Sequence, residues 1–175
     1  MFSEGRSTEV RYFMHTLRDN SNFALKVECC GQVPTSLSAK AKEFHKQSKS
    51  IAEGDLIWVV FDRDEHDHVK RELDSLKAME ISVGYSNPCF ELWLLYHFRD
   101  HHAPDDRNKV KKLLSEVCEG YCEKKLVLLD ASEMNANLDE ARARAKSGVE
   151  ARASEGSELG APSSTVYELF DSLGQ

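Results

Sequence analysis

The sequence lacks any long hydrophobic run. None of its 175 residues belongs to a stretch of roughly 18 consecutive apolar residues, the minimum for a helix that spans a bilayer. The opening residues, MFSEGR, also lack the apolar segment of a secretory signal. These absences predict a cytoplasmic protein with no membrane partner.

Positive charge is scarce as well. The chain has 23 Lys and Arg residues against 30 Asp and Glu residues, which gives a net charge of −7. This balance argues against a protein that holds nucleic acid through a broad basic surface. It does not exclude a metal-dependent nuclease, because a bound metal ion supplies local positive charge. The apolar fraction of 41% is enough for a core, and the length fits one domain with at most a small appendage.

Cysteine is infrequent and irregularly spaced. The five cysteines form no paired C-x-x-C motif, and an odd number cannot pair completely. In a cytosolic protein such residues are most often reduced thiols. A zinc site built from Cys118, Cys122 and two histidines is the less favoured alternative.

The most informative stretch present is LIWVVF at residues 56–61, followed by Asp62, Arg63 and Asp64. Six consecutive apolar residues, several of them β-branched or aromatic, predict a strand buried on both faces. Side chains two residues apart point the same way along a strand, so Asp62 and Asp64 can converge beyond its carboxyl end. Two close carboxylates favour a hard cation such as Mg²⁺ between them. The alternative is that Asp62 only caps the next helix and Asp64 is solvent-exposed.

Strand and helix patterns alternate along the first hundred residues. Strands are expected just before Glu4 and at 23–30, 56–62 and 81–85; helices are expected at 8–17, 36–51, 65–79 and 90–98. This order predicts an α/β fold of the three-layer, Rossmann-like kind, with about four mostly parallel strands flanked by helices. An α+β arrangement is the alternative.

Residues 101–175 have a different character. Helices are expected at 107–120, 134–153 and 165–173, a short helix or strand at 126–129, and a flexible loop at 154–164. We therefore predict an α/β domain over 1–100 and a helical C-terminal extension over 101–175 that packs on it.

Acidic residues are expected at the ends of two strands. Glu4 and Gly5 form a tight turn after the first strand, and Gly5 permits close approach of a backbone or phosphate. Neighbouring strands lie about 5 Å apart, so Glu4, Asp62 and Asp64 would meet at one edge of the sheet. Three carboxylates at one edge are costly unless they hold a metal ion, and this combination is more specific than Asp62 and Asp64 alone.

Four segments resemble the RloB-like family, whose catalytic domain is of the TOPRIM type. Residues 3–13 (SEGRSTEVRYF) resemble its Glu-Gly-x-x-Thr-Glu-x-x-Tyr-Phe opening, and residues 61–64 (FDRD) resemble its Asp-x-Asp. Residues 86–98 (SNPCFELWLLYHF) resemble its Asn-Pro-x-Phe-Glu-x-Trp-Leu-Leu-x-His-Phe signature. Residues 162–166 (PSSTV) resemble its C-terminal segment, with Ala161 in place of the family's Asn. The resemblance therefore covers almost the whole chain.

The resemblance implies a TOPRIM-like fold and a metal-dependent nuclease that acts in defence against phage. It also implies a partner protein with ATPase activity. The expected substrate is DNA or RNA, and a homodimer is an open alternative. Two other function classes stay open: a non-catalytic regulatory or scaffold subunit, and a nucleotidyl-transfer enzyme of the primase type.

Roles can be assigned to the acids on this basis. Asp62 and Asp64 would hold Mg²⁺ or Mn²⁺, which polarises a phosphodiester and lowers the pKa of bound water. Glu4 would bind the metal or act as general acid or base. Glu91, in an otherwise apolar helix, either joins this site or pairs with a buried cation such as Arg63 or Arg11.

Five further residues are expected to bind phosphate or substrate beside the acids: Gly5, Arg6, Arg63, Asn87 and His97. The arginines have the alternative role of balancing the acidic charge, and His97 that of a packed helix residue. Glu9, His66 and His68 are assigned mainly to helix starts.

Overall fold

The central strand β3 (Trp58–Asp62) organises the computed structural model of the protein. The structure describes residues 1–5, 7–17, 24–29, 34–47, 55–63, 69–119, 121 and 131–174. Alternate side chains of β3 enter two different cores: Trp58 and Val60 lie on one face of the sheet, and Val59 and Phe61 lie on the other. The apolar run is thus buried on both faces, and each such side chain contributes about 1.5–3 kcal/mol of burial free energy.

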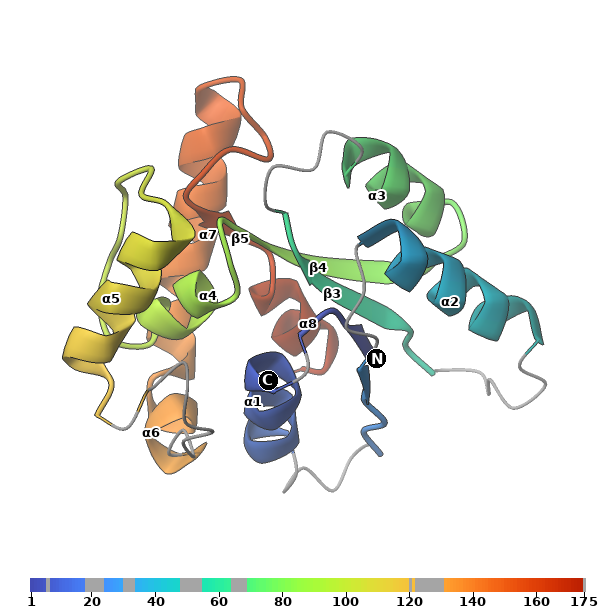
Figure 1. The fold of residues 1–175 in the computed structure, drawn as a ribbon, viewed down its shortest axis with the longest axis horizontal. Helices are drawn as coiled ribbons and strands as arrows, with labels where there is room; N and C mark the ends of the chain where they lie inside the picture. Colours follow the sequence, from blue (N-terminus) through green and yellow to red (C-terminus); the bar gives the residue numbers. More distant parts are fainter. Residues whose placement is uncertain are drawn as a thin grey trace.

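The described strands form one sheet in the order β2 (Glu28–Cys29), β1 (Phe2–Ser3), β3, β4 (Ser82–Asn87) and β5 (Ser163–Ser164). Strands β2, β1, β3 and β4 are parallel to their neighbours, whereas β5 runs antiparallel to β4. The predicted α/β fold with four mostly parallel strands flanked by helices is confirmed (Figure 1).

Strand β5 is an addition to the predicted sheet, and the expectation of a loop through residue 164 is wrong at Ser163 and Ser164. The hydroxyl groups of Ser86 and Ser164 lie 2.9 Å apart, and the backbone N–H of Tyr85 donates to Oγ1 of Thr165 (3.1 Å). A two-residue strand held by hydroxyl groups carries no apolar alternation, so the sequence pattern does not reveal it.

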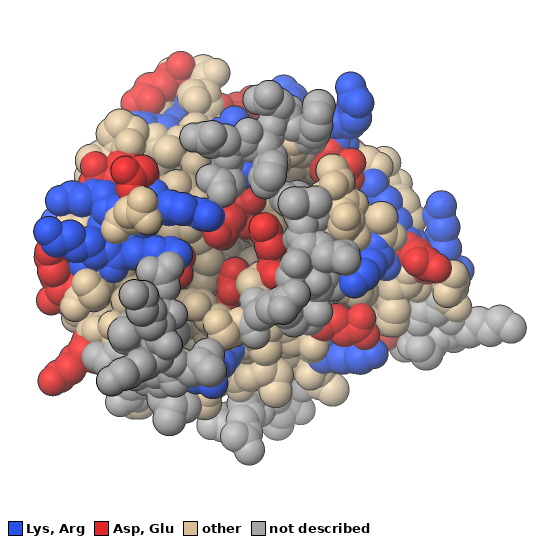
Figure 2. Space-filling model, in the orientation of Figure 1, with Lys and Arg blue, Asp and Glu red and all other residues tan. Residues whose placement is uncertain are grey.

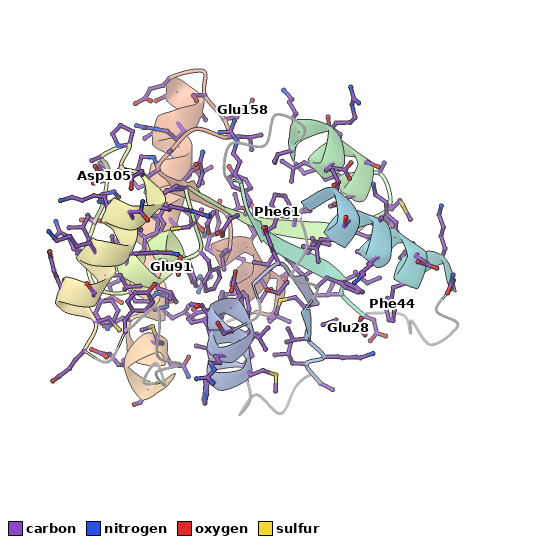
Figure 3. All side chains as sticks on the ribbon, in the orientation of Figure 1. Glu28, Phe44, Phe61, Glu91, Asp105 and Glu158 are labelled. Atoms are coloured by element: carbon purple, nitrogen blue, oxygen red, sulfur yellow. The ribbon has the colours of Figure 1, made fainter. Side chains whose placement is uncertain are left out.

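Two groups of helices cover the sheet (Figure 1). One face packs against α2 (Pro34–Gln47) and α3 (Val69–Lys77), where Phe44 and Phe61 lie (Figure 3). The other face carries the larger core, to which six helices contribute: α1 (Thr8–Thr16), α4 (Glu91–Tyr96), α5 (Arg107–Val117), α6 (Ala131–Ala136), α7 (Leu138–Ser154) and α8 (Tyr167–Ser172).

The C-terminal half differs from prediction in one helix. The helix expected over 134–153 is divided at Asn137 into α6 and α7. Asparagine is a weak helix former, which favours a break at this residue. Helix α7 packs closely on α4 through small residues. A Cβ at Gly148 would lie 3.0 Å from the hydroxyl of Tyr96. The division at residue 100 stays a prediction, although β5 belongs to the same sheet as β1 to β4. The segments expected at 65–68 and 126–129 lie outside the described residues.

Candidate functional site

The carboxyl ends of β1 and β3 bring Glu4 and Asp62 together. Ser3 is paired with Val60, and the backbone N–H of Glu4 donates to the carbonyl of Val60 (3.0 Å). The backbone N–H of Asp62 in turn donates to Oε2 of Glu4 (3.2 Å). The Glu4 side chain therefore reaches across the end of the neighbouring strand, although β1 has only two residues.

Both carboxylate oxygens of Asp62 accept hydrogen bonds. Oδ1 accepts from the backbone N–H of Phe90 (2.8 Å), and Oδ2 accepts from Nη2 of Arg107 (3.2 Å). The N–H of Phe90 lies at the start of α4, so Asp62 contacts a helix that follows the next strand rather than α3. These contacts tie β3, α4 and α5 to one carboxylate that is only 18% exposed.

Glu91 begins α4 and is 7% exposed. Its Oε1 accepts a hydrogen bond from the hydroxyl of Tyr121 (2.9 Å), and Nζ of Lys111 lies 4.0 Å away. Figure 3 shows Glu91 between α4 and α5. Lys111, on α5, was not among the cations considered from the sequence. Burial first, and then the charges of Glu91 and Asp62, raise the pKa of the Cys89 thiol, so this thiol is neutral.

Glu9 is a fourth acid at this place, and sequence reasoning missed it as a functional residue. It is 7% exposed on the face of α1 that also buries Tyr12, Phe13 and Thr16. The carboxylate of Glu9 crosses the turn where a Cβ at Gly5 would stand, so a larger residue there would require this side chain to move. The signal was present: Glu9 occupies the i position of an i, i+3, i+4, i+7 stripe that faces the core.

We call Glu4, Glu9, Asp62 and Glu91 the carboxylate cluster. Burial, followed by the charges of Glu9, Glu91 and Glu4, raises the pKa of Asp62 well above its usual value, and Arg107 lowers it. Burial, followed by the charges of Glu91 and Glu4, raises the pKa of Glu9 to about 7. Figure 2 shows acidic side chains gathered at the centre of this face, beside Lys and Arg side chains over α5. Charges within the cluster thus add to burial in raising the pKa of two of its members, Asp62 and Glu9.

Replacement of Glu9 tests this charge balance. A carboxyl whose pKa rises on folding makes the folded state less stable as the pH rises through that range. For Glu9 the range runs from 4.5 to about 7. We expect Glu9→Gln to increase the free energy of unfolding at pH 8 by about 1–3 kcal/mol and to change it little at pH 4.5. Urea denaturation across this pH range measures the effect.

Glu116→Gln is the matched control, because Glu116 is exposed on α5. It should leave the pH dependence of stability as in the wild type. Equal pH profiles for Glu9→Gln and wild type would show that Glu9 is not protonated on folding in this range.

The donor chemistry of the cluster suits a hard divalent cation, because every member offers carboxylate oxygens. Within the parts of the chain that the structure describes, however, no three His, Cys, Asp or Glu side chains are arranged to hold one ion. Oδ2 of Asp62 is bonded to Arg107, and Asp64 lies outside the described residues. The residue types fit Mg²⁺ or Mn²⁺, whereas the described geometry supplies no complete ligand set.

His97 lies in a buried network with α1 and α4, and its binding of phosphate stays a prediction. It is 2% exposed; Nδ1 lies 3.1 Å from the carbonyl of Trp93, and Nε2 lies 3.1 Å from the hydroxyl of Tyr12. Because a carbonyl only accepts, Nδ1 carries the proton and Nε2 accepts from Tyr12. Burial lowers the pKa of His97 to about 4, so the ring is neutral at pH 7.

The remaining predicted contacts divide into two groups. Asn87 donates its amide to the carbonyl of Leu159 (2.7 Å), which is a structural contact between β4 and the segment before β5. Burial raises the pKa of Tyr85, and the nearby positive charge of Arg63 partly offsets this rise. The cation that is hydrogen-bonded to Asp62 is Arg107. Substrate binding by Gly5, Arg63 and Asn87 stays a prediction.

Arg6, His66 and His68 lie outside the described residues. Cys122 also lies outside the described residues. Of the two cysteines in the alternative zinc site, the structure describes Cys118, which is buried.

These observations define an α/β protein with a partly buried carboxylate cluster beside the carboxyl ends of parallel strands. A family model described as RloB-like protein matches residues 1–173, and the chain belongs to this family. The assignment made from the four sequence segments is thereby confirmed. Comparison with curated proteins and with solved structures gives no match. Among the described residues, no helix is both long and apolar enough to cross a membrane.

Proposed function

We propose that the protein is a metal-dependent nuclease that hydrolyses phosphodiester bonds of DNA or RNA. The observation that carries the proposal is the convergence of half-buried Glu4 and Asp62, from adjacent strand ends, with buried Glu9 and Glu91. Burial, and then repulsion from these acids, raises the pKa of Asp62, and a divalent cation is the partner that would relieve the repulsion. Membership in the RloB-like family supports the same reading.

Asp62, Glu4 and Asp64 are the residues that would hold Mg²⁺ or Mn²⁺. When bound, the ion supplies Lewis-acid polarisation of the phosphodiester and a bound water of lowered pKa. The backbone N–H groups of Phe90 and Asp62 orient the carboxylates of Asp62 and Glu4, respectively. Glu91, fixed by Tyr121, adds a fourth carboxylate from the start of α4. Glu4 would also accept or donate a proton.

The biological setting belongs to the same proposal. The resemblance to RloB-like proteins favours a TOPRIM-type domain, a cytoplasmic role in defence against phage and an ATPase partner. These parts depend on the family and not on contacts in this chain.

A cleavage assay tests the proposal directly. Single-stranded DNA, duplex DNA and RNA are incubated with the full chain in Mg²⁺, in Mn²⁺ or in EDTA. We expect at least one substrate to be cleaved with either metal and none to be cleaved in EDTA. A folded protein that cleaves none of the three with either metal would contradict a self-sufficient nuclease.

A second function is favoured by one observation: both oxygens of Asp62 are bonded within the protein, and no complete ligand set is found among the described residues. This arrangement suits a non-catalytic regulatory or scaffold subunit of a complex that contains an ATPase. That alternative predicts no metal-dependent cleavage by the chain, either alone or together with a co-purifying ATPase.

A further inference from the structure

Helix α5 concentrates positive charge on an acidic chain. Its first six residues, RNKVKK, include four cations, and no acid occurs between residues 107 and 115. We call Arg107, Lys109, Lys111 and Lys112 the basic strip. The whole chain carries a net charge of −7, so this local excess does not follow from composition. Figure 2 shows the Lys and Arg side chains over α5 as a band beside the central acids.

The basic strip has an inner and an outer part. Arg107 and Lys111 are four residues apart, so they share one side of the helix. They point to the carboxylate cluster, where Arg107 bonds Asp62 and Lys111 pairs with Glu91. Lys109 and Lys112 are exposed. Val110 and Leu114 anchor in the core the side of α5 that lies opposite Lys109 and Lys112, which directs these two lysines outward.

We propose that the basic strip, through Lys109 and Lys112, binds the phosphodiester backbone of a nucleic acid and directs it to the carboxylate cluster. This inference rests on the proposed function, because a polyanion needs attraction to approach four carboxylates. With a rise of 1.5 Å per residue, Lys109 and Lys112 lie about 4.5 Å apart along the helix axis, which matches roughly two phosphates of one strand. Backbone contacts of this kind position a nucleic acid without reading its sequence.

Binding in EDTA isolates the strip from catalysis, since no metal-dependent cleavage occurs there. Fluorescence anisotropy would measure the affinity of the full chain for labelled single-stranded DNA, duplex DNA and RNA over a range of salt concentrations. We expect the double variant Lys109→Gln, Lys112→Gln to bind roughly tenfold more weakly. The slope of log K against the logarithm of the salt concentration should become less steep by about 2.

The matched control is Lys40→Gln with Lys46→Gln. These two lysines are exposed on α2, which covers the opposite face of the sheet, and their loss changes net charge equally. The control should bind as the wild type does. Equal affinities for the two double variants would overturn the proposal. A second result would also overturn it: the wild type binds poly-glutamate as tightly as nucleic acid, and Lys109→Gln with Lys112→Gln abolishes that binding too. The basic strip would then be a general site for acidic polymers.

The two proposals can fail separately. If the wild type cleaves nothing in Mg²⁺ or Mn²⁺ but the strip variant loses binding, the result supports nucleic-acid binding by the basic strip and contradicts nuclease activity. Metal-dependent cleavage by the wild type, with unchanged binding by the strip variant, would sustain the nuclease and overturn the strip.

Discussion

Asp62→Asn is expected to reduce metal-dependent cleavage by more than about 100-fold, since even outer partners of metal ligands account for 10–100-fold. The substitution removes one negative charge and keeps the side-chain shape. The amide oxygen can still accept from the N–H of Phe90, so α4 keeps its contact with β3. The amide nitrogen cannot accept from Arg107, but burial and then the charges of Glu9, Glu91 and Glu4 raise the pKa of this carboxyl, so we expect loss of its charge to offset loss of that bond.

Two measurements separate loss of chemistry from loss of fold. The melting temperature of Asp62→Asn should equal or exceed that of the wild type, and Mg²⁺ should raise the melting temperature of the wild type only. Asp74→Asn is the matched control, because Asp74 is exposed on α3. Wild-type cleavage by a folded Asp62→Asn protein would exclude Asp62 as a metal ligand.

The part of the site that sequence could predict is the part that local rules determine. The uninterrupted apolar run predicted that β3 is the central strand, and the positions of the strand ends predicted that Glu4 lies beside Asp62. Both inferences use only alternation along a strand and the spacing between parallel strands. The family motifs added Glu91, whose position at the start of α4 the structure bears out.

The rest depends on contacts between segments far apart in the chain. Arg107 reaches Asp62 across 45 residues, and Tyr121 reaches Glu91 across 30. Nothing in the local pattern of α5 shows which acids its cations will meet. His97 makes the same point, because the sequence left open whether it binds phosphate or packs within the helix, and its ring completes a buried network with Tyr12. The choice between the two roles depends on burial, which one sequence does not give.

Trp93→Ala is expected to lower the free energy of unfolding by about 3–5 kcal/mol, the range for a large aromatic side chain removed from a core. Trp93 is fully buried on α4. Its ring stacks on Phe170 of α8 at 5.7 Å between centroids and meets the His97 ring edge-on at 5.0 Å. Such a loss is a large fraction of the stability of a typical domain. Urea denaturation measures it.

Trp93→Phe keeps most of the ring volume and should cost less than half as much. Met14→Ala, at a side chain 42% exposed on α1, should change stability by less than about 0.5 kcal/mol. Glu91 and Trp93 belong to the same six-residue helix, so we expect the cavity left by Trp93→Ala to loosen the backbone that carries this member of the carboxylate cluster. Cleavage should therefore fall in Trp93→Ala even where the protein stays folded, and recover in Trp93→Phe. A folded Trp93→Ala protein with wild-type cleavage would show that the cluster does not depend on this core.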